Sequence, residues 1–429
     1  MSNAAVKRLA VVGAGWAGLA AAVRATQHGH PVHLFEMAHQ AGGRARSLAS
    51  GAAHLDNGQH ILIGAYRETL ALMRLVGVDT AAALRRSPLE LRYPDGSGIC
   101  LPSGNASLAF VRGVLGSRHW TWPQRLSLLR AAAMWRVHRF ECRQDMTVQD
   151  LCRDLPCAVI RDLVEPLCVA ALNTPMATAS GRVFLKVLKD ALFAGPGSAD
   201  LLLPRVPLSA LLPEAAVAWL GAHGATMHWG RRVISIDSDR DRWSIDGEVF
   251  DAVVLATTAT EAARLSSPIN AAWSHAATSL RYEPIVTVWL LDDSATVLSH
   301  PMMALRSDGR SPAQFVFDLG ALGGAVGLHA WVVSGAADWV ERGLEATAEA
   351  VLQQARSTFP GRFQGPDALR HVRAERRATF ACTPGLNRPS GWIAPGLAAA
   401  GDHVAGSYPA TLEGAVISGN AAWRIALGV

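Results

Sequence analysis

Charged residues are scarce in this 429-residue chain: Lys, Arg, Asp and Glu make up 17% of it, and half of its residues are hydrophobic. A chain this apolar has ample material for buried cores, which excludes an intrinsically disordered protein. The formal net charge is only +5, and no Lys- or Arg-rich run, zinc-finger spacing or RNA-binding signature accompanies it. We therefore expect no nucleic-acid partner, and the length suits two or three domains.

Paired cysteines and long apolar runs are also missing. The six cysteines lie in apolar surroundings and form no Cys-x-x-Cys pair: Cys100, Cys142, Cys152, Cys157, Cys168 and Cys382. They are typical of reduced, mostly buried thiols in a cytosolic protein, and we expect no metal site. Leu9–Ala25 resembles a signal-peptide core, but glycines interrupt it, and no stretch reaches the roughly 20 apolar residues of a spanning helix. We expect a cytoplasmic protein, or one bound only at the inner face of a membrane.

A glycine-rich motif follows the first apolar run, Leu9–Val12, and consists of Gly13, Ala14, Gly15, Trp16, Ala17 and Gly18. A helical pattern over Leu19–Gln27 and an apolar strand over Pro31–Phe35 come next. Strand, glycine turn, helix and strand is the layout of a nucleotide-binding βαβ unit. Glycines also mark ordinary strand-to-helix turns, so the flanking elements carry the prediction.

Each residue of this motif has an expected physical role. Gly13 permits the tight turn, Gly15 lets the backbone approach a pyrophosphate, and Gly18 lets the helix pack close to the strand. The helix N-terminus would direct its N–H groups at the phosphates. Glu36, at the end of the second strand, would accept hydrogen bonds from a ribose. The motif alone leaves NAD and FAD open.

Further elements are expected along the rest of the chain. The pattern predicts a hairpin over Pro88–Leu101 and mainly helices from Leu108 to Leu220. Strands are expected over Val233–Ile236, Arg242–Ile245, Asp251–Ala256, Ile285–Leu291, Gln314–Asp318, Gly327–Val333 and Leu397–Ala400. Helices are expected over Tyr66–Val76, Trp339–Ser357 and Leu412–Ala426. The apolar run at Asp251–Ala256 suits a parallel strand buried on both faces, so the chain returns there to the nucleotide domain.

These elements predict an α/β protein with a discontinuous nucleotide-binding domain. A Rossmann-like domain is expected over residues 1–80, 224–265 and 395–429. A substrate domain of mixed sheet and helices is expected over residues 81–223 and 266–394, inserted into it. No internal repeat or low-complexity linker separates the two.

Two more fragments suit a nucleotide. Gly42 and Gly43 would let a loop pass close under a cofactor, and Arg44 would pair with its phosphates through a planar fork. On its own this fragment favours a surface loop with solvated arginines, and the preceding βαβ unit reverses that preference. Gly401 and Asp402 end an apolar strand, and the following helix begins with a glycine in its first turn, which suits an electron-rich group.

Together these residues resemble the FAD-containing amine oxidase and carotenoid desaturase superfamily, from Leu9 to the end of the chain. The resemblance implies amine-oxidase-like architecture and FAD, with Asp402 near the ribityl-pyrophosphate, residues 413–415 near the flavin ring and Val233 at the adenine. The implied cofactor-binding residues are Gly13, Ala14, Gly15, Trp16, Ala17, Gly18, Glu36, Gly42, Gly43, Arg44, Gly58, Gln59, His60, Val233, Gly401, Asp402, Leu412, Glu413, Gly414 and Ala415.

Within that superfamily the chain is similar to the hydroxysqualene dehydroxylases, formerly called squalene-associated FAD-dependent desaturases. The block Asp56–Tyr66 is the most discriminating part of the match, and Arg376–Phe380 also belongs to it. This resemblance implies an oxidoreductase that removes the allylic hydroxyl of hydroxysqualene, giving squalene for bacterial hopanoid synthesis. The alternatives are a carotenoid or isoprenoid desaturase or oxidase of the same fold, and a non-catalytic flavin-carrying scaffold for isoprenoid synthases.

An acid is needed to release water, and two residues are expected to supply it. His60 lies in the block that the resemblance places beside the flavin, and imidazole holds a proton near neutral pH. The alternative for His60 is a structural hydrogen bond, and in that case Tyr408 or an ordered water is the next candidate. At Thr411 the amine oxidases carry an aromatic residue that cages the amine, which argues against amine oxidation here.

The segment 108–140 combines arginines with aromatic and apolar residues and has no acid until Glu141. Its arginines are Arg112, Arg118, Arg125, Arg130, Arg136 and Arg139. Such helices suit a membrane interface from which a triterpene is drawn. A solvated basic face over a buried stripe is the alternative.

Overall fold

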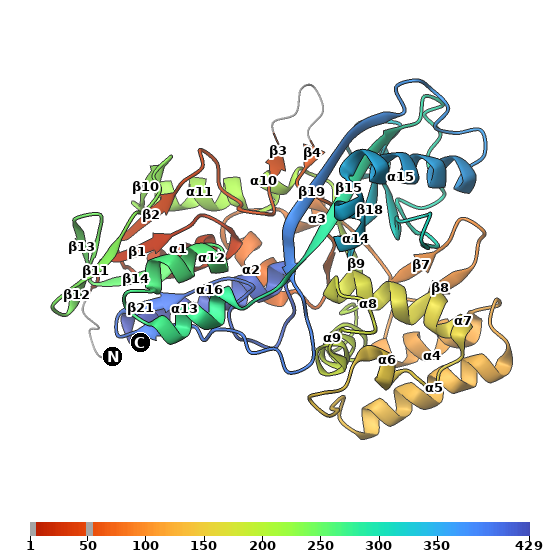
Figure 1. Cartoon of the computed structure of the whole chain (residues 1–429), viewed down its shortest axis with the longest axis horizontal. Helices are drawn as coiled ribbons and strands as arrows, with labels where there is room; N and C mark the ends of the chain where they lie inside the picture. Colours follow the sequence, from red (N-terminus) through yellow and green to blue (C-terminus); the bar gives the residue numbers. More distant parts are fainter. Residues whose placement is uncertain (1–5, 49–54) are drawn as a thin grey trace.

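A six-stranded sheet forms the centre of the first lobe of this computed structural model, which describes residues 6–48 and 55–429. In spatial order its strands are β10 (Thr226–Trp229), β2 (Val32–Glu36), β1 (Leu9–Val12), β14 (Ala252–Leu255), β21 (Leu397–Ala399) and β20 (Trp392–Ala394). The first five are parallel and β20 is antiparallel. The sheet thus joins three distant parts of the chain (Figure 1).

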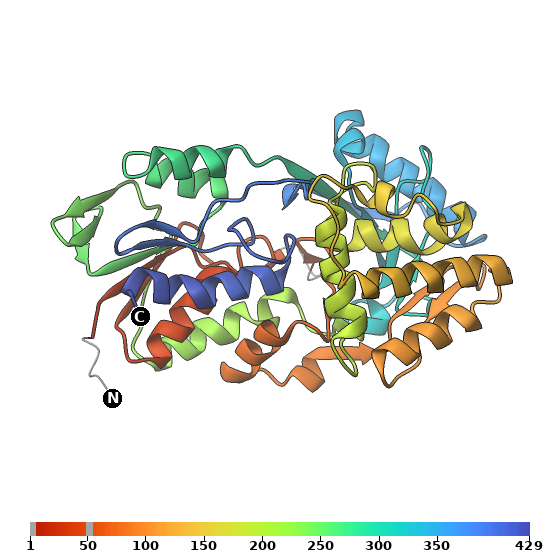
Figure 2. The same ribbon diagram turned by 90° about the horizontal axis from the view of Figure 1, so that it is seen from below.

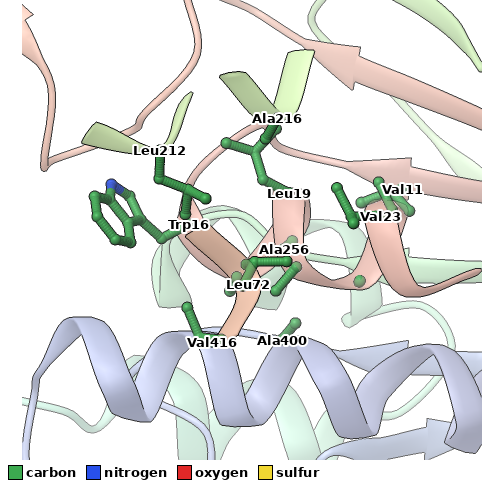
Figure 3. Close-up of a cluster of buried hydrophobic side chains, with 14 of the residues drawn as sticks. Val11, Trp16, Leu19, Val23, Leu72, Leu212, Ala216, Ala256, Ala400 and Val416 are labelled. Carbon is green, nitrogen blue, oxygen red and sulfur yellow. The ribbon is translucent and has the colours of Figure 1, made fainter. Parts of the chain in front are cut away.

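Helices from both ends and the middle of the chain cover one face of this sheet. They are α1 (Trp16–Gln27), α2 (Arg67–Leu75), α11 (Pro213–Ala222) and α16 (Leu412–Leu427). Helices α1 and α16 approach so closely that a Cβ added at Gly419 would lie 2.1 Å from the Ala17 carbonyl oxygen. Figure 3 shows Leu19 of α1, Val416 of α16 and Leu72 of α2 converging on one cluster. The expected boundary at residue 223 falls just after α11, and we propose that α11 belongs with this lobe.

The opposite face carries a small antiparallel sheet and two helices. The sheet consists of β11 (Ile236–Asp239), β12 (Arg242–Ile245) and β13 (Glu248–Phe250), and the helices are α12 (Ala259–Ser266) and α13 (Ala271–Thr278). The strand predicted over Val233–Ile236 is wrong in its bounds. It begins only at Ile236, because the Asp246 carboxylate accepts the N–H groups of Ile234 and Ser235 and so replaces the ladder there.

The second lobe contains a five-stranded antiparallel sheet. Its order is β16 (Met302–Ala304), β17 (Phe315–Asp318), β18 (Leu328–Val333), β15 (Tyr282–Leu291) and β19 (Leu369–Phe380). Against it pack α14 (Ala337–Arg342) and α15 (Leu344–Thr358). The single helix predicted over Trp339–Ser357 is wrong, because Gly343 adopts φ +102° and ends α14 there.

A helical insert completes the second lobe. Its elements are α4 (Ala106–Gly116), α5 (Trp122–Val137), α6 (Val148–Leu151), α7 (Cys157–Val159), the π-helix η1 (Ile160–Val164), α8 (Glu165–Leu172) and α9 (Gly181–Phe193). Figure 2 shows α4 and α5, in orange, at the end of the molecule remote from the C-terminus. The hairpin β7 (Glu90–Arg92) and β8 (Gly98–Cys100) is confirmed. Among the described residues, no helix is long and apolar enough to cross a membrane.

Short strands link the two lobes. They are β5 (Leu62–Ile63), β9 (Leu201–Pro204) and β6 (Leu84–Ser87), which form a three-stranded sheet. Strand β9 interrupts the range expected to be mainly helical. Near it lie α3 (Thr80–Ala83), α10 (Leu208–Leu211) and the pair β3 (Ser47–Leu48) and β4 (Leu55–Asp56).

Candidate flavin and substrate site

Two glycine segments form a narrow cradle above the carboxyl ends of β1 and β2. Gly13 has φ +106°, and a Cβ there would lie 2.5 Å from the Ala256 carbonyl oxygen. Gly42 donates its N–H to the Ala14 carbonyl at 2.8 Å, and a Cβ on Gly43 would come within 3.2 Å of the Gly15 Cα. Side chains would fill this space. The cradle therefore suits a pyrophosphate held by backbone N–H groups at the start of α1.

The Glu36 carboxylate lies beside this cradle. It accepts the N–H groups of Ala14 at 2.8 Å and Ala38 at 2.9 Å, which fixes the glycine loop relative to β2. Val233 lines the same end of the cavity, and its carbonyl accepts a hydrogen bond from Arg264 at 2.7 Å. One of the two backbone groups expected to hold an adenine is therefore already engaged.

Arg44 and Asp402 meet across the cavity, although they are 358 residues apart. Arg44 Nη2 lies 2.5 Å from Asp402 Oδ1, and Nη1 donates to the carbonyls of Arg377 and Ala378 at 3.1 and 2.7 Å. Burial opposes the charge of Arg44, but the adjacent carboxylate outweighs it and raises the pKa of Arg44. The guanidinium is thus paired with Asp402 and with two backbone carbonyls, and its expected pairing with a phosphate stays a prediction.

One continuous cavity of about 690 Å³ runs from the cradle into the second lobe. Most of the predicted site residues line it: Gly13, Gly15, Trp16, Ala17, Glu36, Gly42, Gly43, Arg44, Gly58, Gln59, His60, Val233, Gly401, Asp402, Tyr408, Leu412 and Ala415. Its far end is largely apolar. That end includes Leu167, Leu188, Leu192, Met302, Phe315 and Phe317.

Four predicted cofactor residues are not among those that line the cavity. Gly18 is a packing residue, since a Cβ there would lie 1.9 Å from the Gly13 carbonyl oxygen. Ala14 contributes its N–H to Glu36. The Glu413 carboxylate accepts the N–H groups of Glu68 and Thr69 at 3.0 and 2.9 Å.

Glu413 therefore caps α2 and does not line the cavity, whereas Leu412 and Ala415 of the same turn do, so its place near the flavin ring stays a prediction. Burial raises the pKa of this carboxyl, although the hydrogen bonds from Thr69 and Glu68 oppose that shift. Gly414, the fourth residue, follows it in the first turn of α16. Its N–H donates to the Thr411 hydroxyl at 3.1 Å, so Thr411 is the N-cap of that helix.

His60 faces the cavity, but its surroundings disfavour a positive charge. Burial and the nearby Arg44 lower the pKa of His60 to about 4, although the Gly58 backbone opposes that shift. Its Nδ1 is buried and has no hydrogen-bond partner among the described residues. These surroundings disfavour the proton that His60 is expected to carry near neutral pH. A neutral imidazole with a free ring nitrogen suits a bound partner that makes a hydrogen bond there.

Tyr408 lies on the cavity wall next to a charged pair that the sequence did not reveal. Its hydroxyl is hydrogen-bonded to Asp190 of α9, and burial together with that carboxylate raises the pKa of Tyr408. Lys186 Nζ lies 2.6 Å from an Asp190 oxygen and 5.7 Å from the centre of the Tyr408 ring. Tyr408 therefore keeps its proton at neutral pH and lies where the cradle meets the apolar chamber.

The sequence also did not reveal a row of polar residues on β19, formed by Arg373 and Glu375, that contacts Asn57. Arg373 donates to Asn57 Oδ1 at 2.7 Å, and the Asn57 amide donates to Glu375 at 3.1 Å and to the Arg44 carbonyl at 2.8 Å. All four residues line the cavity. Arg373 and Glu375 are two residues apart on one strand and therefore share a face. That spacing is the signal from which these two residues could have been predicted.

A family model described as "Flavin containing amine oxidoreductase" matches residues 16–426. A relative from Sinorhizobium fredii named hydroxysqualene dehydroxylase is 28% identical and covers 98% of both chains. A zeta-carotene desaturase from Synechocystis sp. is 41% identical, but only over 16% of this chain and 14% of its own. The crystal structure of an oxidoreductase from Methanosarcina mazei matches at a TM-score of 0.73 and 18% identity over 96% of this chain and 99% of that one.

These matches agree with the geometry of the site. The family model spans both lobes, and the likeness to the solved structure shows that the two lobes form a known fold. The glycine cradle fits a flavin nucleotide, and so does His60 Nδ1, which has no hydrogen-bond partner in the part of the chain that the structure describes. The chain belongs to the flavin-containing amine oxidoreductase family.

Proposed function

We propose that this chain is an FAD-dependent hydroxysqualene dehydroxylase that reduces hydroxysqualene to squalene in bacterial hopanoid synthesis. The observation that carries the proposal is the single cavity, in which a flavin cradle opens directly into a largely apolar chamber. A relative with this name that matches over 98% of both chains supports it. The zeta-carotene desaturase match covers 16% of the chain, which favours the dehydroxylase over a desaturase.

The reaction is R–OH + FADH2 → R–H + H2O + FAD. Protonation of the allylic hydroxyl releases water and leaves a delocalised cation, and the reduced cofactor supplies the hydride that quenches it. A chamber that excludes bulk water protects this cation from recapture. The apolar lining around Leu188, Phe315 and Phe317 suits that requirement.

FAD, rather than a smaller flavin, suits the first lobe. Glu36 ends β2 beside the cradle, where a ribose hydroxyl would meet its carboxylate, and Val233 lies further along the same cavity. A mononucleotide would leave that end without a ligand. The test is the identity of the cofactor released on heat denaturation of the purified protein.

Tyr408 is the group we assign to the departing water. It keeps its proton at neutral pH, whereas His60 is neutral there, and it lies beside the N-terminal turn of α16. Asp190 holds its hydroxyl in place, and Lys186 balances the charge of Asp190. We assign His60 a hydrogen bond to the bound flavin or substrate in place of the proton transfer first expected of it.

A membrane surface is the source we propose for the substrate. Helices α4 and α5 carry many of the exposed large apolar side chains: Leu108, Val111, Leu115, Trp122, Leu126, Met134 and Val137. Exposed arginines such as Arg130 and Arg136 lie among them. Apolar residues with interspersed positive charge suit the interface of an anionic bilayer. Isoprenoid synthases that deliver hydroxysqualene would meet the enzyme on the same surface.

Anaerobic incubation of the reduced protein with hydroxysqualene tests the proposal against its rivals. The dehydroxylase re-oxidises its flavin and yields squalene. A desaturase or oxidase leaves the reduced flavin and the substrate unchanged, but its oxidised form becomes reduced when a carotenoid precursor is added. A non-catalytic scaffold changes neither the redox state of the flavin nor the added isoprenoid, in both incubations.

A further inference from the structure

A small second void lies beneath α5, one layer of side chains away from the main cavity. It measures about 20 Å³ and is lined by Phe110, Leu128, Ala132, Trp135, Leu163, Val164, Leu167, Phe184, Leu188, Leu192 and Phe193. Leu167, Phe184, Leu188 and Leu192 line the main cavity as well. These four side chains separate the two spaces, and all the residues around the void are apolar.

Helix α5, which covers this void, is held by few buried side chains. Among its sixteen residues, Leu128 and Ala132 are buried, whereas Trp122, Leu126 and Val137 are more than half exposed. Helix α16 has the same length, and seven of its residues are buried. A helix anchored so lightly opens at a smaller free-energy cost than one packed into a core.

An irregular segment borders the void on its other side. Leu163 and Val164 belong to the π-helix η1, where the chain departs from α-helical hydrogen bonding before α8 begins. Single π turns inside helices are frequent at functional sites. The void is thus bounded by α5 and by a segment of irregular helix.

We propose that the seam between α5 and α9 is the entry passage for the isoprenoid chain of the substrate. An apolar chain leaves the bilayer beside the exposed side chains of α4 and α5 and passes through the void. It displaces Phe184, Leu188 and Leu192 to reach the flavin end. The inference rests on the proposed function, since it requires a long apolar substrate. It accounts for an apolar void between an exposed apolar surface and the cavity.

A matched pair of substitutions tests the passage. Ala132→Phe places a ring in the void, whereas Ala133→Phe places the same ring on the exposed face of the same helix. We expect Ala132→Phe to lower kcat/KM for hydroxysqualene at least tenfold while the flavin spectrum and its reduction by dithionite stay unchanged. Ala133→Phe should stay within twofold of the parent. Equal rates for the two variants would overturn the proposal.

Leu128→Ala provides a second variant in case Ala132→Phe folds poorly. It removes side-chain atoms from the void, so we expect kcat/KM to be unchanged or up to fivefold higher. A tenfold loss with intact flavin absorbance would mean that Leu128 supports the fold and does not restrict a passage, which contradicts the proposal.

Photolabelling separates the passage from the proposed reaction. A farnesyl chain bearing a diazirine, presented in vesicles of phosphatidylglycerol and phosphatidylcholine, should label peptides from α5 and α9 whether or not the protein turns over hydroxysqualene. Labelling confined to other surfaces would overturn the passage. A protein that is labelled there but inactive would retain the passage and refute the dehydroxylase assignment.

Discussion

The two ends of the cavity are built in different ways. The flavin end is made of backbone, because Gly15 and Gly43 approach so closely that a Cβ would fill the gap. The substrate end is made of side chains from α8, α9 and the five-stranded sheet, most of which are apolar. The first arrangement tolerates almost no substitution, whereas the second tolerates many residues of similar volume. Binding of the cofactor should therefore be far more sensitive to single changes than the shape of the chamber.

The largest expected effect is at the backbone cradle. Gly15→Val should abolish retention of the flavin, because its side chain would occupy the place of the pyrophosphate. The ratio of flavin to protein after purification measures this. Gly116→Val is the matched control, since Gly116 lies on α4 with open space around its Cβ position. Normal flavin content in Gly15→Val would show that the cradle is placed wrongly.

The next effect is at the junction between the two ends. Tyr408→Phe should keep FAD but slow the single turnover of pre-reduced enzyme by about 10²–10⁴-fold, or roughly 3–5 kcal/mol of barrier. Tyr93→Phe removes a hydroxyl that donates to the Asp162 carbonyl at 3.2 Å, and it serves as the control. His60→Ala should cost less than Tyr408→Phe. If the order is reversed, His60 moves the proton and Tyr408 does not.

Acid should destabilise the flavin end through a buried imidazole. Burial lowers the pKa of His403 to about 4, although Asp402 opposes that shift, so the native state favours neutral His403. The contribution of His403 to the free energy of unfolding is complete above pH 6.5, the ordinary pKa of histidine. It is lost as the pH falls to about 4. That loss is at most about 3 kcal/mol. Urea unfolding at pH 7.5 and 4.5 measures it, and His403→Gln should flatten the difference while His119→Gln leaves it intact.

The smallest expected effect is at the outer surface of the second lobe. Binding to anionic vesicles should weaken as salt rises, and Arg130→Gln with Arg136→Gln should weaken it by about 1 kcal/mol per charge. Arg125 should matter less than these two, because its guanidinium already donates to the carbonyls of Leu115 and Trp120. Sedimentation with vesicles measures the affinity. Binding that does not depend on salt would leave the arginines as a solvated face.

The same difference between the two ends explains what the sequence could predict. The βαβ unit and the strand β14 were predictable because glycine spacing and a run of apolar residues are local signals. The start of β11 was not predictable, because the Asp246 carboxylate accepts the backbone N–H groups of Ile234 and Ser235 in place of a neighbouring strand. Strand β10 lacks an apolar run and depends on its pairing with β2.

The candidate site was predictable to a similar degree. Glycine is needed where the backbone lies close to a cofactor. The residues of the cradle could therefore be identified from the glycine positions in the sequence. The pairing of Arg44 with Asp402 depends on two segments 358 residues apart, and no local pattern contains it. Asp190 reads in the sequence as an ordinary i,i+4 partner of Lys186, and only the fold turns it toward Tyr408. The low pKa of His60 likewise depends on tertiary burial.

One turnover in D2O tests the proposed dehydroxylation most directly. Enzyme reduced anaerobically to FADH2 and equilibrated in D2O is mixed with one equivalent of hydroxysqualene, and the product is analysed by mass spectrometry. A dehydroxylase yields one squalene per flavin oxidised, with one deuterium incorporated at the carbon that carried the hydroxyl. Flavin that stays reduced while hydroxysqualene is recovered unchanged would contradict it.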